Sequence, residues 1–211
     1  MKKNLLFVAA ISVFVALASC AGGGETATEE STTPEEVVVE SNTWTIDSAA
    51  SSVRWEGGTA GAQVYSHFGT IGVQSGMVTT EGGAITAGKF EIDMTSISPK
   101  DENYSEENPA SKLVGHLASD DFFSIETYPT ATFVVKSAEG NAVTGDLTIK
   151  GKTHEETINV ESMNISEDGM TAAGTLVFDR QKYDVAWAHY LKDVVLSDDI
   201  TLNITLSAKK G

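Results

Sequence analysis

The sequence predicts an all-β fold made of antiparallel strands that each bury one face. From Trp44 onward, apolar and polar residues alternate in short runs, which is the two-residue period of a strand. Residues 200–207 are the clearest run, with four aliphatic side chains alternating with Thr, Asn, Thr and Ser. Turn-forming residues separate the runs, notably Gly140 and Gly169. A hydrophobic content of 41% is enough to give such strands a common core.

The predicted strands follow one another closely along the chain, and about eight to ten of them can be placed. The clearest candidates are residues 90–95, 131–136, 147–150 and 200–207, and further candidates are residues 53–56, 69–74, 157–165 and 171–179. So many short antiparallel strands favour a closed barrel or a sandwich, and the periodicity alone does not separate these two architectures.

One long connection, residues 99–129, interrupts the alternation. It is rich in acidic and polar residues, and we expect it to carry one or two short helices. Ser119 followed by Asp120 and Asp121 is typical of a helix N-terminus, where a hydroxyl group and early carboxylates satisfy free amides. Pro129 would end any helix and start the next strand.

Residues 1–19 have the layout of an export signal. Two lysines precede an apolar run, and small residues follow it. A membrane-spanning helix needs roughly 20 apolar residues, so this shorter run is interpreted as a signal peptide and not as an uncleaved anchor.

The end of this segment, residues 17–20 (LASC), resembles the lipobox of bacterial lipoproteins. The resemblance implies that Cys20, the single cysteine of the chain, receives a diacylglyceryl group and becomes the mature N-terminus. Two acyl chains give stable membrane anchoring, whereas one chain gives only marginal binding. The alternative is a free exported thiol that pairs between molecules.

Residues 20–42 are predicted to be a lipidated, flexible, acidic tether. After Cys20 this stretch contains six glutamates, no lysine or arginine, and a bias toward Gly, Thr and Ser that cannot build a core. The folded domain is then residues 43–211. No aspartate follows Cys20, which by resemblance to Gram-negative lipoproteins favours the outer membrane of the cell envelope over the inner membrane.

The charge balance excludes functions that need a basic surface. The chain has 30 acidic and 14 basic residues, a formal net charge of −16. The predicted domain alone has 24 acidic and 12 basic residues, a net charge of −12. Such a surface repels phosphate backbones, so we expect no nucleic-acid partner. The sequence identifies no protein partner.

A motif in the long connection resembles the core of a known family. It comprises residues 115–123 (GHLASDDFF) and 128–133 (YPTATF), with flanking segments in matching order over about residues 43–209. These residues resemble the YceI-like polyisoprenoid-binding family, in its lipoprotein variant. The resemblance implies an antiparallel eight-stranded, lipocalin-like barrel. It also implies an apolar cavity for a long isoprenoid, an isoprenoid quinone or a similar amphiphilic lipid, without a catalytic cofactor.

Aromatic residues are the main candidates for lining such a cavity, since pockets for apolar ligands are built mostly from hydrophobic and aromatic side chains. One cation is a candidate partner for a ligand head group or for a buried carboxylate such as Asp179. The candidate ligand-binding residues are Trp55, Phe122, Phe123, Tyr128, Phe133, Arg180 and Trp187.

Two other functions remain open at this point. The aromatic residues could fill the barrel completely, which would make the domain an envelope interaction module that binds no ligand. Alternatively, His116 with Asp120 or Asp121 could support proton transfer in a hydrolytic enzyme. The four histidines are widely separated and form no close ligand pair, so the sequence gives no positive indication of a metal site.

Overall fold

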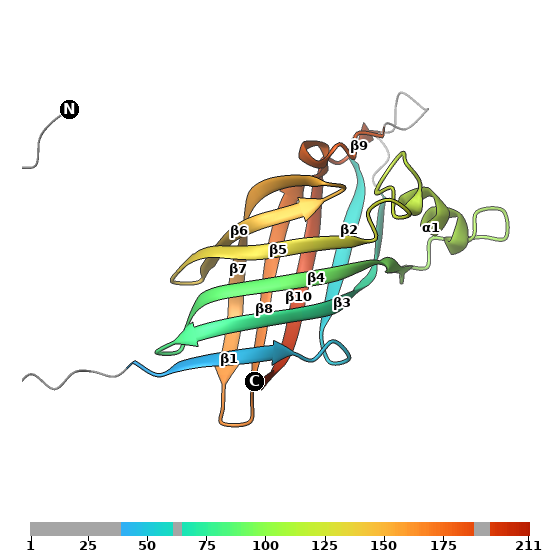
Figure 1. Ribbon diagram of the computed structural model, residues 1–211. Coiled ribbons are helices and arrows are strands. Elements are labelled where there is room, and N and C mark those ends of the chain that lie inside the picture. The colour runs from blue at the N-terminus through green and yellow to red at the C-terminus, as the bar shows by residue number, and fades with distance from the viewer. Residues whose placement is uncertain (1–38, 61–64, 188–194) are drawn as a thin grey trace, which may run out of the picture. The chain divides into compact units, whose positions relative to one another are not determined.

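The strands form one closed antiparallel barrel, with a short α-helix, residues 110–118, beside one of its ends (Figure 1). The computed structural model describes residues 39–60, 65–187 and 195–211. Within these residues the predicted all-β, antiparallel barrel is confirmed.

The predicted signal peptide, residues 1–19, and the predicted lipidation site, Cys20, lie outside the described residues. The same holds for most of the predicted tether, residues 20–42. The first strand begins at Ser41, two residues before the predicted start of the domain.

Ten strands and two helical segments make up the described part of the chain, and most strands are longer than the alternation predicts. In chain order they are β1 (Ser41–Ile46), β2 (Ser52–Ala60), β3 (Ser66–Glu81), β4 (Ala84–Pro99), α1 (Ala110–Ala118), β5 (Thr130–Glu139), β6 (Ala142–Ile149), β7 (Lys152–Ile165), β8 (Gly169–Asp179), the 3-10 helix η1 (Arg180–Tyr183), β9 (Val195–Leu196) and β10 (Asp199–Lys210).

The barrel closes through pairing between β10 and β2, while neighbours along the chain from β2 to β8 pair in sequence and β8 pairs with β10. Both β1 and β2 run antiparallel to β3 and to β10, on successive stretches of those two strands. Together β1 and β2 therefore occupy one position in the ring. The ring thus has eight positions, as the family resemblance implied, and the two-residue β9 pairs antiparallel with the end of β2.

The alternation in the sequence arises because inward residues are buried and outward residues meet solvent. In β6 every second residue is buried, including Val143, Leu147 and Ile149. Between them, Thr148 faces outward and its hydroxyl is 2.8 Å from that of Thr153 on β7. An eight-stranded barrel built in this way has an interior just wide enough for side chains or for one slender ligand.

One end of the barrel is filled by the protein's own side chains. Trp44 on β1 is almost completely buried, and its indole N–H donates to the hydroxyl of Thr80 on β3 at 2.9 Å. Val78 and Met170 are buried at the same level of exposure as Trp44. Buried indole N–H groups need a partner, and Thr80 supplies one where no water reaches.

The opposite end, here called the α1 end, carries the long connection. Helix α1 packs on β4 through an apolar face that includes Leu113 and Leu117. The predicted helix start at Ser119 is wrong, because Ser119 lies just after the end of α1 and its hydroxyl donates to the carbonyl oxygen of His116 at 2.8 Å. A hydroxyl that caps a helix start accepts from a backbone N–H, whereas the Ser119 hydroxyl donates to a carbonyl oxygen in the last turn of α1.

In the described part of the chain, no helix is both long enough and apolar enough to cross a membrane.

Substitution by alanine at two glycines near the α1 end should change the free energy of unfolding in opposite directions. A Cβ on Gly69 would lie 2.2 Å from the carbonyl oxygen of Ser98 and 2.6 Å from the ring of Trp55, so Gly69→Ala should lower the free energy of unfolding by about 1–3 kcal/mol. Gly115, inside α1, has nothing within 4 Å of such a Cβ. Gly115→Ala should therefore raise stability by about 0.5–1 kcal/mol.

Urea denaturation of both variants and the parent chain measures this difference. Equal destabilisation by the two substitutions would contradict the packing described at Gly69.

Candidate ligand-binding cavity

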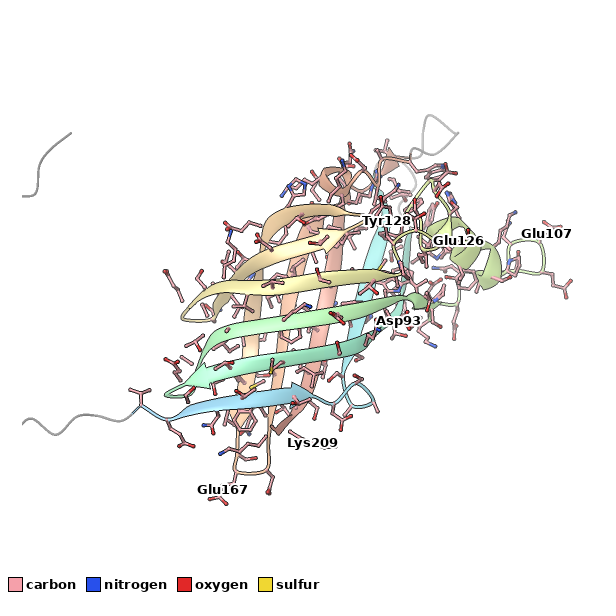
Figure 2. The ribbon with its side chains drawn as sticks, in the orientation of Figure 1. Asp93, Glu107, Glu126, Tyr128, Glu167 and Lys209 are labelled. Carbon is pink, nitrogen blue, oxygen red and sulfur yellow. The ribbon has the colours of Figure 1, made fainter. Side chains whose placement is uncertain are left out.

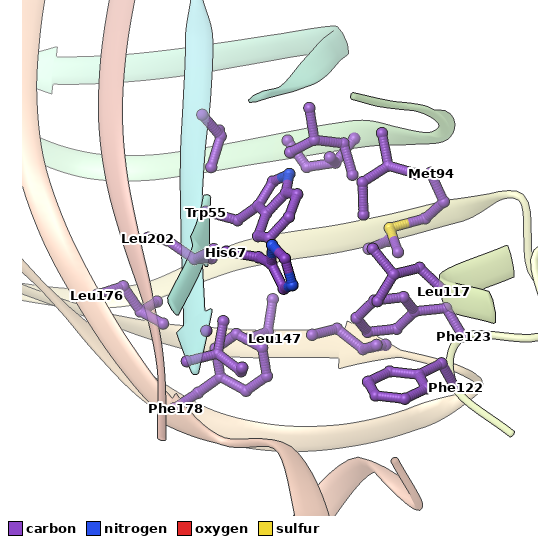
Figure 3. Close-up of a pocket in the computed structure, with 18 of the residues that line it drawn as sticks. Trp55, His67, Met94, Leu117, Phe122, Phe123, Leu147, Leu176, Phe178 and Leu202 are labelled. Atoms are coloured by element: carbon purple, nitrogen blue, oxygen red, sulfur yellow. The ribbon is translucent and has the colours of Figure 1, made fainter. Parts of the chain in front are cut away.

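The barrel encloses an apolar cavity of about 380 Å³, which extends from the α1 end into the interior (Figure 3). This volume lies within the usual range for small-molecule sites. Its wall consists mainly of aliphatic and aromatic side chains on the inward faces of the strands, such as Leu147, Leu176 and Leu202. A barrel filled by its own aromatic residues, one of the two alternatives left by the sequence, would leave no such space.

Five of the seven predicted ligand-binding residues line this cavity. They come from four separate parts of the chain: β2, the turn after α1, β5 and the segment after η1. They are Trp55, Phe122, Phe123, Phe133 and Trp187. Whether they contact a ligand stays a prediction.

A tight turn directs Phe122 and Phe123 toward the barrel. The backbone N–H of Phe123 donates to the carbonyl oxygen of Leu117 at 3.1 Å, and Ser124 has a left-handed φ of 48° that reverses the chain. The turn that orients these two rings therefore begins directly at the C-terminal end of α1.

Four rings cluster at the α1 end and form what we call the aromatic cap: His116, Phe122, Phe123 and Trp187. The ring of His116 meets Phe122 and Trp187 edge-on, with centroid distances of 4.9 and 4.6 Å. Phe122 lies 6.0 Å from Phe123 and 5.9 Å from Trp187. The aromatic cap therefore joins α1, its following turn and the segment after η1 across the cavity.

Arg180 lies outside the cavity wall and has a structural role. Its side chain is buried, and its guanidinium donates to the carbonyl oxygens of Ser197, Val185 and Trp187 and to the carboxylate of Asp198. The carboxylate named from the sequence, Asp179, instead accepts from the backbone N–H of Gln181 at 2.8 Å. Arg180 thus fixes the backbone that carries Trp187 and is not available to a ligand in the cavity.

Tyr128 also lies outside the cavity, at the α1 end of the barrel (Figure 2). Its side chain is exposed and covers the turn between β6 and β7, where a Cβ on Gly151 would be 2.9 Å from its ring. Tyr128 is therefore a surface residue that packs over a tight turn and does not line this cavity, and its contact with a ligand stays a prediction.

The sequence did not reveal one polar cluster at the rim of the cavity, formed by His67, Asp101 and Tyr104. His67 lines the cavity, and its Nδ1 is 3.1 Å from the Asp101 carboxylate. The Tyr104 hydroxyl donates to the same carboxylate at 2.6 Å, and the Tyr104 ring stacks on His67. His67 and Asp101 are 34 residues apart and match no short motif, so no sequence signal links them.

Asp101 is a buried carboxylate, and two backbone N–H groups also donate to it, those of Phe68 and Asn103. Burial by itself would raise the pKa of Asp101. The hydrogen bonds from Tyr104, Asn103, His67 and Phe68 outweigh burial, and they hold the pKa below its ordinary value. Burial and the negative charge of Asp101 in turn raise the pKa of Tyr104. The cluster therefore contains an ionised aspartate and a neutral tyrosine.

The arrangement around His116 does not form a preassembled acid–base pair. His116 Nε2 lies 4.0 Å from the Asp121 carboxylate, which is mostly exposed, and this distance exceeds hydrogen-bond length. Asp120 interacts through its backbone, accepting from Lys150 at 2.9 Å. Within the described residues, no three His, Cys, Asp or Glu side chains gather in a way that could hold a metal ion.

Comparison with known proteins decides the family. Residues 44–208 match the sequence profile of the YceI-like domain. The chain belongs to the YceI-like family. The predicted family is thereby confirmed, and the motif at residues 115–123 lies in the part of this YceI-like domain that carries α1 and the aromatic cap.

Curated relatives of this YceI-like domain include two staphylococcal UPF0312 proteins. The protein from Staphylococcus epidermidis is 44% identical over 78 residues, which cover 33% of this chain and 44% of that protein. The protein from Staphylococcus aureus strain USA300 is 40% identical over 93 residues, covering 40% of this chain and 54% of that protein. The chain thus spans about half the length of the curated relatives it matches.

Two solved structures share the fold. BcnA from Burkholderia cenocepacia superposes with a TM-score of 0.54 at 23% identity, covering 78% of this chain and 99% of BcnA. A polyisoprenoid-binding domain from Saccharophagus degradans, implicated in plant cell wall breakdown, has a TM-score of 0.54 at 16% identity. That match covers 80% of this chain and 98% of that domain. At these identities the likeness establishes the barrel and nothing finer.

The Asp101 cluster should make stability depend on pH. Because folding lowers the pKa of Asp101, its contribution is present above the ordinary pKa and is lost as the pH falls through the lower, folded value. We expect Asp101→Asn to cost about 2 kcal/mol at pH 7, and the difference from the parent should shrink below about pH 4.

Thermal melts of both proteins between pH 3 and 7 measure this effect. The control is Asp121→Asn, which changes a mostly exposed carboxylate and should leave the melting curve unchanged. A gap between parent and Asp101→Asn that stays constant down to pH 3 would argue against the charged cluster.

Proposed function

We propose that this protein is an exported lipoprotein that takes up a long-chain isoprenoid, or a similar amphiphilic lipid, in the cavity of its barrel. The observation that carries the proposal is the cavity itself, about 380 Å³ of apolar space enclosed by a closed ring of strands. The Saccharophagus degradans domain with the same fold is described as polyisoprenoid-binding, which supports the same class of ligand here.

The chemistry of the wall favours a slender hydrocarbon chain. Inward positions of the strands supply aliphatic side chains along the whole cavity, and the aromatic cap supplies flat surfaces at the α1 end. Transfer of apolar surface out of water would provide the affinity, at roughly 25 cal/mol per Å². We propose Trp55, Phe122, Phe123, Phe133 and Trp187 as ligand contacts, and we propose no cofactor.

Binding without catalysis is the function that the site supports best. The described geometry places no hydrogen-bonded acid–base pair at His116, and the apolar wall suits sequestration or transport of a lipid. Under this proposal the protein holds an insoluble molecule in an aqueous compartment and leaves its covalent structure unchanged.

Cell-envelope localisation is part of the proposal and rests on residues 1–20. The export signal and the lipobox-like end would place the domain on a membrane through two acyl chains on Cys20, with the outer membrane favoured. A carrier attached in this way would stay close to the membrane in which its ligand dissolves.

The proposal predicts that affinity depends on ligand length. Each added five-carbon unit should strengthen binding about tenfold, at about 0.3 kcal/mol per carbon atom, until the cavity is full. Titration of the purified protein with isoprenoids of increasing length, in competition with an apolar fluorescent probe, measures this dependence. An affinity that does not change with length would contradict binding in the cavity.

Phe90 offers a matched variant for the same experiment. Its side chain lines both the main cavity and a second void of about 50 Å³ that lies deeper in the barrel. Phe90→Ala should connect the two spaces, so the length at which affinity stops rising should increase. Its melting temperature should fall, because truncation of a phenylalanine in a core removes packing. An unchanged limiting length would mean that the tail does not reach Phe90.

The anchor has a separate test in the native host. Cys20→Ala should abolish incorporation of a labelled fatty acid and release the protein from the membrane fraction. Ser19→Ala, which keeps a small residue before the cysteine, should retain the label. Labelling of the Cys20→Ala protein at parent levels would refute lipidation at this residue.

A further inference from the structure

The α1 end of the cavity contains polar groups that a hydrocarbon tail would not use. Trp55 and His67 come from the neighbouring strands β2 and β3, and Figure 3 shows both side chains at the cavity. His116, in the aromatic cap, lines the same cavity from α1. The opposite, deeper part of the wall is formed by residues such as Val73, with no polar side chain. The cavity is therefore polar at one end only.

Asp101 sets the hydrogen-bonding character of His67. An ionised carboxylate can only accept, so the imidazole donates to Asp101 from Nδ1, and in the neutral tautomer that this hydrogen bond selects Nε2 is an acceptor. Tyr104 stacks on the ring and bonds to the same carboxylate, so the imidazole is held on two sides. In the part of the chain that the structure describes, Nε2 of His67 has no hydrogen-bond partner.

Two further nitrogen atoms in the cavity wall have no partner among the described residues. The indole N–H of Trp55 and Nε2 of His116 are both buried and make no hydrogen bond there. More than nine tenths of buried polar groups in proteins are paired, so each exception needs an explanation. Both unpaired atoms lie in the wall of one cavity, which also contains Nε2 of His67. Three polar atoms without a partner in the described part of the protein indicate that the ligand carries a polar group.

The charges around the cavity indicate which polar group this is. Among the described residues, no lysine or arginine lines the cavity, and the single buried arginine at this end is fully engaged by protein acceptors. Proteins usually bind phosphate with these cations or with several converging N–H groups. The predicted domain also has a net charge of −12, which opposes an anionic head group. A neutral group fits this environment.

We propose that the α1 end of the cavity selects a ligand with a neutral hydroxyl head group, which His67 accepts from and the indole N–H of Trp55 donates to. This inference rests on the proposed function, since it specifies the polar end of the same lipid. A hydroxyl group both donates and accepts a hydrogen bond, and it therefore complements one acceptor and one donor. Asp101 and Tyr104 act as positioning residues, because they orient His67 and do not reach the ligand.

The test compares three ligands that share one tail: a long-chain polyprenol, its monophosphate, and the isoprenoid hydrocarbon with the same number of five-carbon units. Competition against an apolar fluorescent probe gives the affinity of each for the purified chain. The polyprenol should bind about tenfold more tightly than the hydrocarbon, as expected for one buried hydrogen bond, and more tightly than the monophosphate. Equal or tighter binding of the monophosphate would overturn the inference.

His67→Phe should remove the preference without removing the cavity. We expect the affinity for polyprenol to fall about tenfold and the affinity for the hydrocarbon to stay unchanged, which also shows that the variant is folded. His67→Gln, which keeps an acceptor, should restore part of the preference. The control is His154→Phe, a histidine outside the cavity wall that packs edge-on against Tyr183, and it should change neither affinity.

The outcomes separate this inference from the proposed function. If neither the polyprenol nor the hydrocarbon binds to the parent protein, the carrier function itself fails. If both bind, and His67→Phe weakens them equally or not at all, the carrier function stands and the assignment of the head-group site is overturned.

Discussion

Closure of the hydrogen-bonded ring between β10 and β2 is the constraint on which the rest of the structure depends. In a ring of eight strand positions, inward side chains from opposite walls fill the interior only in part. The strands pair their backbone N–H and C=O groups around the whole ring, which leaves no edge strand with unpaired groups among the described strands of the ring. The interior therefore needs no polar side chains to pair with such groups. For this reason the space between the walls can stay apolar and open, as the cavity of about 380 Å³ shows.

The two ends of the ring differ in how their interior is occupied. At one end Trp44 fills the interior and gives its indole N–H to Thr80, which leaves no buried polar atom of that ring unpaired. At the α1 end the wall is completed by residues from outside the sheet, and the aromatic cap holds three of these segments together through ring contacts. The cavity extends to this end, where residues of the long connection complete its wall.

Two buried charged residues stabilise the structure of the α1 end and do not line the cavity. Arg180 ties the segment that carries Trp187 to the residues before β10, and Asp101 holds the imidazole of His67. Both are saturated by hydrogen bonds from the protein, which is the condition under which a buried charge is tolerated. The acidic surface of the domain is thus separate from the cavity, and recognition of a lipid would depend on shape, apolar area and a few hydrogen bonds.

Strands β1 and β9 were not predicted, but the sequence by itself located the other eight described strands, because the two-residue alternation reports directly which side chains of one strand face inward. It also determined the family, through the motif at residues 115–123, and it named five aromatic residues that line the cavity. Only the tertiary structure decided what depends on register between distant segments. The pairing of β10 with β2, the contact of His67 with Asp101 and the use of Asp198 in place of Asp179 by Arg180 all join residues that no local pattern connects. Tyr128 shows the same limit, since alternation and motif do not reveal toward which side a residue in a loop will point.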